Sequence, residues 1–239
     1  MSRTALPSAM IFDVFGTLVD YRTSVAREVR RAFECCGQNV DSLAFADSWR
    51  AAYEPSMEPV RSGRRPYVPL DVLHYENLCS VLRQFELAGI LSHDRKIELS
   101  RAWERLDPWP DAVAGLDRLK AATLIAPCSN GSVGLMVRLA RHAGFSWDCI
   151  LGADIAKTYK PDPNVYLASC EALGLSPGRV MMVAAHNQDL EAAAAVGLQT
   201  GFISRPTEFG PGQTTDLSPA GDWTVTAANA VDLAGQFGL

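Results

Sequence analysis

Two hydrophobic periodicities divide the chain into a mainly helical segment and a segment in which strands and helices alternate. Residues 9–14 form a short apolar run that contains Asp13 near its end, a pattern typical of a buried parallel strand with an acid at its carboxyl end. Apolar residues then recur at helical spacing without a strong strand signal. The helices predicted from this spacing cover residues 25–36, 43–53, 71–87 and 94–106.

Beyond Pro110 the pattern changes to repeated strand and helix units. Strands are predicted at residues 123–128, 149–151, 180–184, 200–203 and 223–225, and helices at residues 111–121, 133–143, 163–173, 189–196 and 228–237. Such alternation predicts an α/β protein with a doubly wound parallel sheet. We therefore expect a Rossmann-like core, made of residues 1–18 and 101–239, with a helical cap of residues 19–100 inserted after the first strand.

The composition is that of a globular protein and argues against nucleic-acid-binding and membrane proteins. Hydrophobic residues make up 48% of the 239 positions and charged residues 21%, and the net charge is −5, without the basic excess of a nucleic-acid binder. No apolar run reaches the roughly 18–20 residues of a membrane span, and residues 1–10 lack the apolar centre of a signal peptide. The six cysteines form no CxxC pair, which favours reduced thiols over disulfides or a zinc site. We expect a cytoplasmic protein with neither a nucleic-acid nor a membrane partner.

Polar side chains follow three of the predicted strands and occupy one loop between strands. These segments are Asp13-Val14-Phe15-Gly16-Thr17, Ser129-Asn130-Gly131, Tyr159-Lys160-Pro161-Asp162 and Ala185-His186-Asn187-Gln188-Asp189. Each alone is more typical of a turn or a helix cap. Because open α/β sheets bind ligands at the carboxyl ends of their strands, all four in this order predict one shared site.

Together the four motifs resemble the haloacid dehalogenase superfamily over residues 10–237, with the insert in the position of that family's helical cap. Most members are phosphatases that carry a second Asp two residues after the nucleophile, where it protonates the leaving alcohol. Here that position is Phe15, which has no proton to donate. An aromatic residue at this position resembles the L-2-haloacid dehalogenase branch of the superfamily. In that branch the leaving group is a halide, which departs without needing a proton from an acid.

This resemblance implies hydrolytic dehalogenation of short L-2-haloalkanoic acids to D-2-hydroxy acids and halide, through an aspartyl ester on Asp13 and without metal or other cofactor. Lys160 would keep Asp13 ionised and would stabilise the oxyanion that forms during hydrolysis of the ester. Arg50 would bind the departing halide. The catalytic residues implied in this way are Asp13, Thr17, Arg50, Ser129, Lys160, His186 and Asp189. The substrate contacts implied are Phe15, Asn130, Tyr166 and Asn187.

In these roles Thr17 and Ser129 position Asp13, and Asp189 with His186 assists the water that attacks the ester. Without the resemblance, Arg50 is typical of a solvated helix charge, Tyr166 of helix packing and Asp189 of a helix N-cap. The chain departs from the branch at Ala184-Ala185-His186, where Ser-Ser-Asn is usual. The imidazole can donate or accept a hydrogen bond near the nucleophile and can titrate near neutral pH.

Two other functions stay open on the sequence alone. One is a phosphatase with Mg²⁺ between Asp13 and Asp189, since hard cations prefer carboxylate oxygens. The other is a non-catalytic binding protein, because a fold does not establish an activity. The partners expected for the dehalogenase are its substrate, water and the halide product. The resemblance further implies a homodimer, with the apolar insert helices as the candidate interface.

Overall fold

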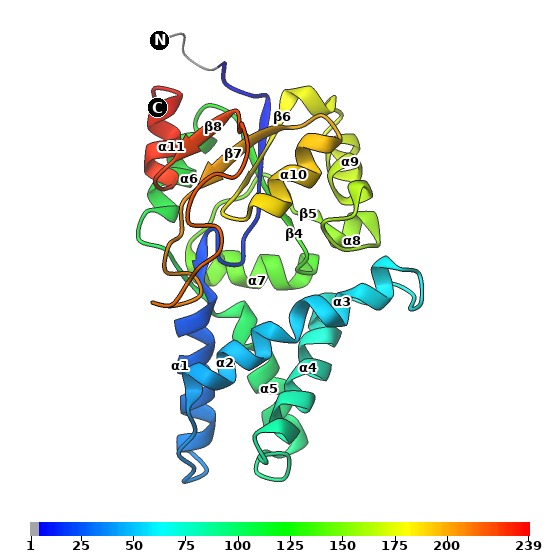
Figure 1. Ribbon diagram of the computed structural model, residues 1–239, viewed down its shortest axis with the longest axis vertical. Coiled ribbons are helices and arrows are strands. Elements are labelled where there is room, and N and C mark those ends of the chain that lie inside the picture. Colours follow the sequence, from blue (N-terminus) through cyan, green and yellow to red (C-terminus); the bar gives the residue numbers. More distant parts are fainter. Residues whose placement is uncertain (1–4) are drawn as a thin grey trace.

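The computed structural model describes residues 5–239, and its centre is a parallel sheet that forms the upper part of Figure 1. Within the described residues this sheet has six strands in the order β5-β4-β1-β6-β7-β8. The strands are β1 (Ala9–Phe12), β4 (Leu124–Ser129), β5 (Leu151–Gly152), β6 (Val180–Ala184), β7 (Gln199–Ile203) and β8 (Val225–Ala227). Every residue of β1 is buried between β4 and β6, which is why its sequence is continuously apolar. The predicted α/β fold is confirmed.

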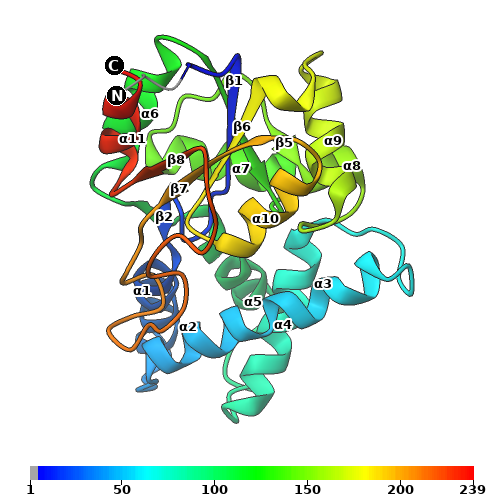
Figure 2. The same cartoon turned by 45° about the horizontal axis from the view of Figure 1, so that its top comes forward.

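Helices cover both faces of the sheet. They are α6 (Ala112–Lys120), α7 (Val133–Ala143), α8 (Ala153–Ala156), α9 (Pro163–Ala172), α10 (Asn187–Ala195) and α11 (Ala230–Gln236), with a short 3-10 turn η2 (Pro177–Arg179). Alternate β1 side chains enter two separate cores: Met10 and Phe12 pack with α6, α7 and α11, whereas Ala9 and Ile11 pack with α9 and α10. Figure 2 shows α6 and α11 on one side of the sheet and α9 and α10 on the other.

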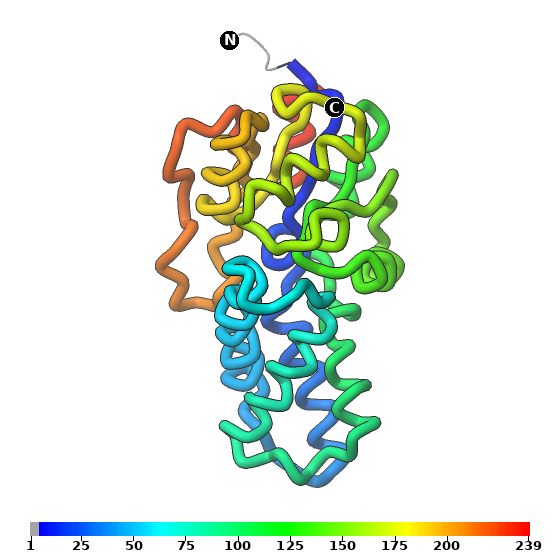
Figure 3. Tube along the Cα trace, turned by 90° about the vertical axis from the view of Figure 1, so that its right-hand side faces the viewer, coloured from blue at the N-terminus to red at the C-terminus, as the bar shows by residue number. Residues whose placement is uncertain are grey.

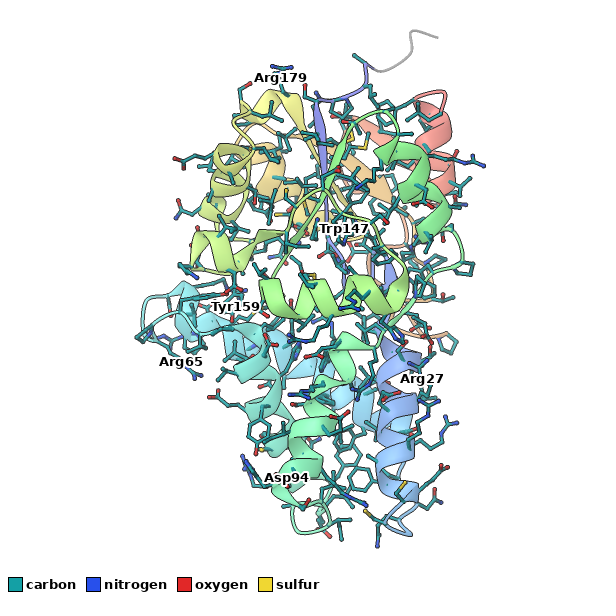
Figure 4. All side chains as sticks on the ribbon, turned by 180° about the vertical axis from the view of Figure 1, so that it is seen from behind. Arg27, Arg65, Asp94, Trp147, Tyr159 and Arg179 are labelled. Atoms are coloured by element: carbon teal, nitrogen blue, oxygen red, sulfur yellow. The ribbon has the colours of Figure 1, made fainter. Side chains whose placement is uncertain are left out.

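A second, wholly helical part lies beyond the carboxyl ends of the strands, as Figure 3 shows in the lower half of the trace. It comprises α1 (Tyr21–Glu34), α2 (Ser42–Ala51), α3 (Tyr53–Arg61), α4 (Leu70–Gln84), α5 (His93–Ser100) and the 3-10 turn η1 (Arg101–Glu104). Two short antiparallel strands, β2 (Val19–Asp20) and β3 (Asp107–Pro108), join it to the sheet. Tyr159, labelled in Figure 4, lies where the two parts meet and donates from its hydroxyl to the Val68 carbonyl at 2.5 Å.

Several element boundaries differ from the sequence prediction. Neither β2 nor β3 was predicted, because two residues are too short to establish a period. Residues 43–53 were predicted as one helix, but α2 ends at Ala51 and a separate helix, α3, continues past Pro59. The segment predicted as helix to residue 106 leaves the α conformation after Ser100 and becomes the turn η1. The edge strands β5 and β8 begin two residues later than expected, where pairing with their neighbours starts.

A buried arginine fastens the loop after β7 to the core. The Arg205 Nε donates to the Thr17 carbonyl at 2.8 Å, and its two terminal nitrogens donate to the Asp111 carboxylate at 2.8 and 2.7 Å. Only 7% of Arg205 is exposed. The loop of residues 204–224 has little regular structure. The contacts of Arg205 therefore hold the beginning of this loop beside the carboxyl ends of the strands.

Replacing Arg205 by Ala is expected to lower the free energy of unfolding by about 3 kcal/mol, because it leaves Asp111 largely buried without its cation. Urea denaturation followed by circular dichroism measures this change. Arg141→Ala, on the exposed surface of α7, is the matched control and should stay within about 0.5 kcal/mol of the parent. Equal unfolding free energies for Arg205→Ala and the control would show that the buried pair contributes nothing net.

Candidate active site

A cavity of about 190 Å³ lies between the carboxyl ends of the central strands and the helices α2 and α3. It is the point at which the sheet and the helical part face each other. Its walls are Asp13, Phe15, Arg50, Tyr53, Glu54, Asn130, Lys160, Pro161, His186, Gln188, Asp189 and Asp216. The lining thus unites residues that directly follow β1, β4 and β6 with residues of the helical part, as expected for ligand sites in open α/β sheets.

The carboxylate of Asp13 is held at both oxygens just after β1. Oδ1 accepts a hydrogen bond from Lys160 Nζ at 2.9 Å, and Oδ2 accepts one from the Thr17 hydroxyl at 2.7 Å. The Thr17 hydroxyl in turn accepts from the Ala185 backbone N–H at 2.9 Å, so its proton is directed at Asp13. Burial on its own raises the pKa of the Asp13 carboxyl, but Lys160 and His186 outweigh burial and hold the pKa well below its ordinary value. Asp13 is therefore a charged, fixed carboxylate that faces the cavity.

The Lys160 ammonium lies between the carboxylates of Asp13 and Asp189 and contacts both. Burial favours the neutral amine and lowers the pKa of Lys160, but the two carboxylates outweigh it and raise the pKa above the ordinary value. The backbone also fixes this residue, because Lys160 N–H donates to Asn130 Oδ1 at 2.7 Å and Lys160 carbonyl accepts from Arg61 at 3.0 Å. The cation shared by Asp13 and Asp189 is thus this ammonium.

Asp189 stands in the first turn of α10, and both of its oxygens have donors. Oδ1 accepts from the Tyr166 hydroxyl at 2.5 Å, and Oδ2 contacts the Lys160 ammonium. Burial, followed by repulsion from Asp13, raises the pKa of Asp189, although Lys160 and Tyr166 act in the opposite direction. Tyr166 is fully buried and lies outside the cavity lining. In this structure its hydroxyl supports Asp189 and does not reach the cavity as a substrate contact.

Arg50 brings a cation to the cavity from the last turn of α2. Its guanidinium lies over the ring of Tyr53 at 4.4 Å and over that of Tyr21 at 5.3 Å. Within residues 5–239 its buried Nε has no hydrogen-bond partner. Burial lowers the pKa of Arg50, but the two tyrosines and Glu208 outweigh this and raise it. Arg50 therefore remains charged and holds donor capacity for an anionic ligand.

Three other residues expected at the site lie outside the lining, namely Thr17, which supports Asp13 from behind, Ser129 and Asn187. The Ser129 hydroxyl is buried and accepts from the Gly131 N–H at 3.0 Å, so it shapes the turn after β4. The Asn187 side chain lies outside the cavity lining and binds the loop of residues 204–224 through four hydrogen bonds. Its partners are Asp216, the Ser218 carbonyl, the Ala220 N–H and the Trp223 indole. The expected substrate contact of Asn187 does not fit this geometry, because both donors and the acceptor are committed to the loop.

Sequence reasoning missed several residues of the site. Tyr53 ends the stretch of residues 43–53 predicted as a helix, and Glu54 and Asp216 belong to no predicted motif, whereas Gln188 lies inside one of the four motifs without a role of its own. Glu208 was also missed: its carboxylate is 1% exposed and contacts His186 behind the cavity wall. Nothing in a single sequence marks Glu208, because its loop has no hydrophobic period and only tertiary packing brings it to the strand ends.

Comparison with known proteins gives a consistent result. The family model of the haloacid dehalogenase-like hydrolases matches residues 7–197. (S)-2-Haloacid dehalogenase 4A of Burkholderia cepacia is 30% identical over 95% of this chain and 97% of its own length. (S)-2-Haloacid dehalogenase 1 of Pseudomonas sp. (strain CBS-3) is 33% identical over 84% of this chain and 87% of its own.

Solved structures agree with these sequence matches. The crystal structure of the defluorinating L-2-haloacid dehalogenase Rha0230 is 50% identical and superposes with a TM-score of 0.94, covering 97% of this chain and 95% of that one. The crystal structure of the L-2-haloacid dehalogenase PA0810 is 45% identical with a TM-score of 0.93, covering 96% of this chain and 98% of that one.

Proposed function

The chain belongs to the haloacid dehalogenase-like hydrolases and to their (S)-2-haloacid dehalogenase branch, and we propose that it hydrolyses short L-2-haloalkanoic acids to 2-hydroxy acids and halide. One observation carries this proposal: Asp13 is a charged carboxylate at a small cavity that also contains the Arg50 cation and, at the position of a phosphatase acid, the phenyl ring of Phe15. This arrangement suits an anionic substrate whose leaving group departs without a proton.

The first step is displacement at the carbon that bears the halogen. A carboxylate oxygen of Asp13 forms a bond to this carbon while the carbon–halogen bond breaks and the halide leaves with the electron pair. Lys160 and Thr17 fix the carboxylate for this attack, and Arg50, with Asn130 beside the same cavity, stabilises the departing anion. Attack from the side opposite the halogen inverts the carbon, so an L substrate gives a D product.

The second step is hydrolysis of the aspartyl ester. Water attacks the Asp13 carbonyl carbon, so the configuration of the product carbon is untouched. The Lys160 ammonium, 2.9 Å from Asp13 Oδ1, stabilises the oxyanion that forms. Residues 19–100 act as the cap that excludes bulk water during displacement, which strengthens the charges of Lys160 and Arg50.

Halide release in the absence of metal tests this function. The full-length protein is given L-2-chloropropionate with EDTA, and chloride and 2-hydroxypropionate are measured. Equal amounts of both are expected, at a rate that EDTA does not change. Absence of chloride together with Mg²⁺-stimulated cleavage of phosphate esters would identify a phosphatase instead. Absence of both activities would favour a non-catalytic binding protein.

Arg50→Lys is expected to lower kcat/KM for chloride release by roughly 10- to 100-fold, which matches the ~1.5–3 kcal/mol of a hydrogen bond to a charged group. An ammonium lacks the planar set of donors and cannot stack on Tyr53 and Tyr21 in the same way. Arg64→Lys, exposed after α3, serves as control and should retain the parent kcat/KM. If Arg50→Lys retained the parent kcat/KM, the guanidinium of Arg50 would have no role in the reaction.

A cytoplasmic location and a homodimer complete the proposal. No helix in the described part of the chain is long and apolar enough to cross a membrane. The helical part exposes separate apolar side chains that suit contact with a second copy, namely Leu43, Val72, Ile90 and Ile97. Light scattering of the purified protein gives the mass that decides between monomer and dimer.

A further inference from the structure

His186 connects Asp13 to a second, buried carboxylate. Its Nε2 lies 2.9 and 3.0 Å from the two oxygens of Glu208, and its Nδ1 lies 3.2 Å from Asp13 Oδ2. The imidazole lines the cavity with 18% of its side chain exposed, whereas the Glu208 side chain is 1% exposed. One ring nitrogen is therefore held from behind by a carboxylate, and the other faces the proposed nucleophile.

The fold makes specific room for the Glu208 carboxylate. A Cβ added to Gly16, whose φ is +86°, would lie 2.1 Å from Glu208 Oε1, so only glycine at this turn allows the approach. Arg205, three residues earlier in the same loop, is anchored to the Thr17 carbonyl. A carboxylate buried this deeply needs a partner, and the side chain that contacts it is His186. The turn of residues 13–17 that follows β1 and the loop of residues 204–224 thus both pack against the His186 imidazole.

Asp189 is poorly suited to activate water in this site. Its Oδ1 accepts from Tyr166 and its Oδ2 contacts Lys160, so both oxygens are already engaged by strong donors. His186 Nδ1, by contrast, faces Asp13 and the cavity. In Ser-His-Asp enzymes the general base is likewise an imidazole with one nitrogen held by a carboxylate and the other free to take a proton from the attacking nucleophile.

We propose that His186 is the base that activates water for hydrolysis of the Asp13 ester, and that Glu208 is the positioning residue that holds the imidazole by its Nε2–H with Nδ1 toward the ester. This inference rests on the proposed dehalogenase function and assigns the second step of that reaction. The resemblance implied that Asp189 and His186 together assist the water; this inference assigns the base to His186 alone and gives Glu208 a role that its sequence context does not indicate.

The protons of the reaction balance through His186. In the resting site Asp13 and Glu208 outweigh burial and raise the pKa of His186 well above its ordinary value, so the ring is an imidazolium. Formation of the ester removes the charge of Asp13, and the Nδ1 proton is then lost to solvent as the proton that the overall hydrolysis produces. The other charged groups around the cavity are Arg50, Glu54, Lys160, Asp189 and Asp216.

The neutral imidazole then takes a proton from water while the water oxygen bonds to the Asp13 carbonyl carbon. The tetrahedral intermediate breaks the bond from this carbon to the ester oxygen. The departing alkoxide receives the remaining water proton from the new hydroxyl group on Asp13. The cycle ends with the 2-hydroxy acid, the Asp13 carboxylate and the His186 imidazolium restored.

The test measures halide displacement and ester hydrolysis separately in two variants, Glu208→Gln and His186→Asn. Each variant is mixed with L-2-chloropropionate and quenched at short times, and both released chloride and Asp13-bound ester, the latter by mass spectrometry, are measured. We expect a rapid release of one chloride per active site, followed by turnover slowed at least ~100-fold, with the ester accumulated on Asp13. The double variant should be no slower than His186→Asn, because both residues act on the same step.

Glu191→Gln, exposed on α10, is the matched control and should turn over at the parent rate without ester accumulation. Parent-like turnover in His186→Asn would overturn the proposal, as would loss of the initial chloride release along with turnover in both variants. His186→Asn carries the test by itself if Glu208→Gln does not fold. A parent protein that releases no chloride would instead contradict the dehalogenase function, which keeps the two failures distinct.

Discussion

Replacement of Asp13 by Asn is expected to reduce steady-state halide release on the order of 10⁴-fold or more, as does removal of a nucleophile in other hydrolases. The amide is nearly the same size as the carboxylate and still accepts from Thr17, so the cavity keeps its shape. It is neutral, however, and does not displace halide. Chloride release from L-2-chloropropionate measures the loss, and mass spectrometry should find no ester-linked 1-carboxyethyl group on the variant.

The control for this replacement is Asp117→Asn on the exposed side of α6, which removes a carboxylate far from the cavity and should leave the rate unchanged. The Lys160 ammonium keeps Asp189 as its partner in Asp13→Asn, and the variant should therefore still fold. A folded Asp13→Asn protein with parent turnover would refute the assignment of the nucleophile.

The part of the site formed at strand ends could be predicted from the sequence. β1 is buried on both faces, so its apolar run is unbroken and its carboxyl end is marked by Asp13. The same reasoning places Asn130 after β4 and His186 after β6, and all three line the cavity. Arg50 required the family resemblance, because helical periodicity alone does not distinguish a cation that faces a cavity from one that faces water.

The residues that could not be predicted depend on tertiary packing. Glu208 and Asp216 belong to an irregular loop whose path is fixed by the contacts of Arg205 and Asn187 and not by a local period. Asn187 was expected at the substrate from the family resemblance, within the segment that also contains His186. It begins α10, however, and its side chain turns toward the loop. Sequence proximity to a site therefore predicts the location of a backbone segment but not the direction of each side chain.

Replacement of Lys160 by Met is expected to abolish activity near neutral pH and to lower the free energy of unfolding by about 3 kcal/mol or more, because it leaves Asp13 and Asp189 buried side by side without their shared cation. In the parent, Lys160 and His186 overcome burial and hold the pKa of Asp13 below 3.8. Asp13 then contributes stability above this pH that is lost only as the pH falls through its lower folded value.

In Lys160→Met the sign reverses. Burial and repulsion from Asp189 then raise the folded pKa of Asp13 relative to the parent, so charging these carboxylates opposes folding. Once their folded pKa values exceed the unfolded values, stability is highest at acid pH and falls as the pH rises through the folded values. Urea denaturation at about pH 4 and pH 7 should therefore show a difference between parent and variant that grows with pH, whereas Lys157→Met, exposed beside α8, should show none. A difference that is constant or shrinks with rising pH would mean that the ammonium contributes packing and not charge compensation, and Asp13 would then owe its ionisation to His186.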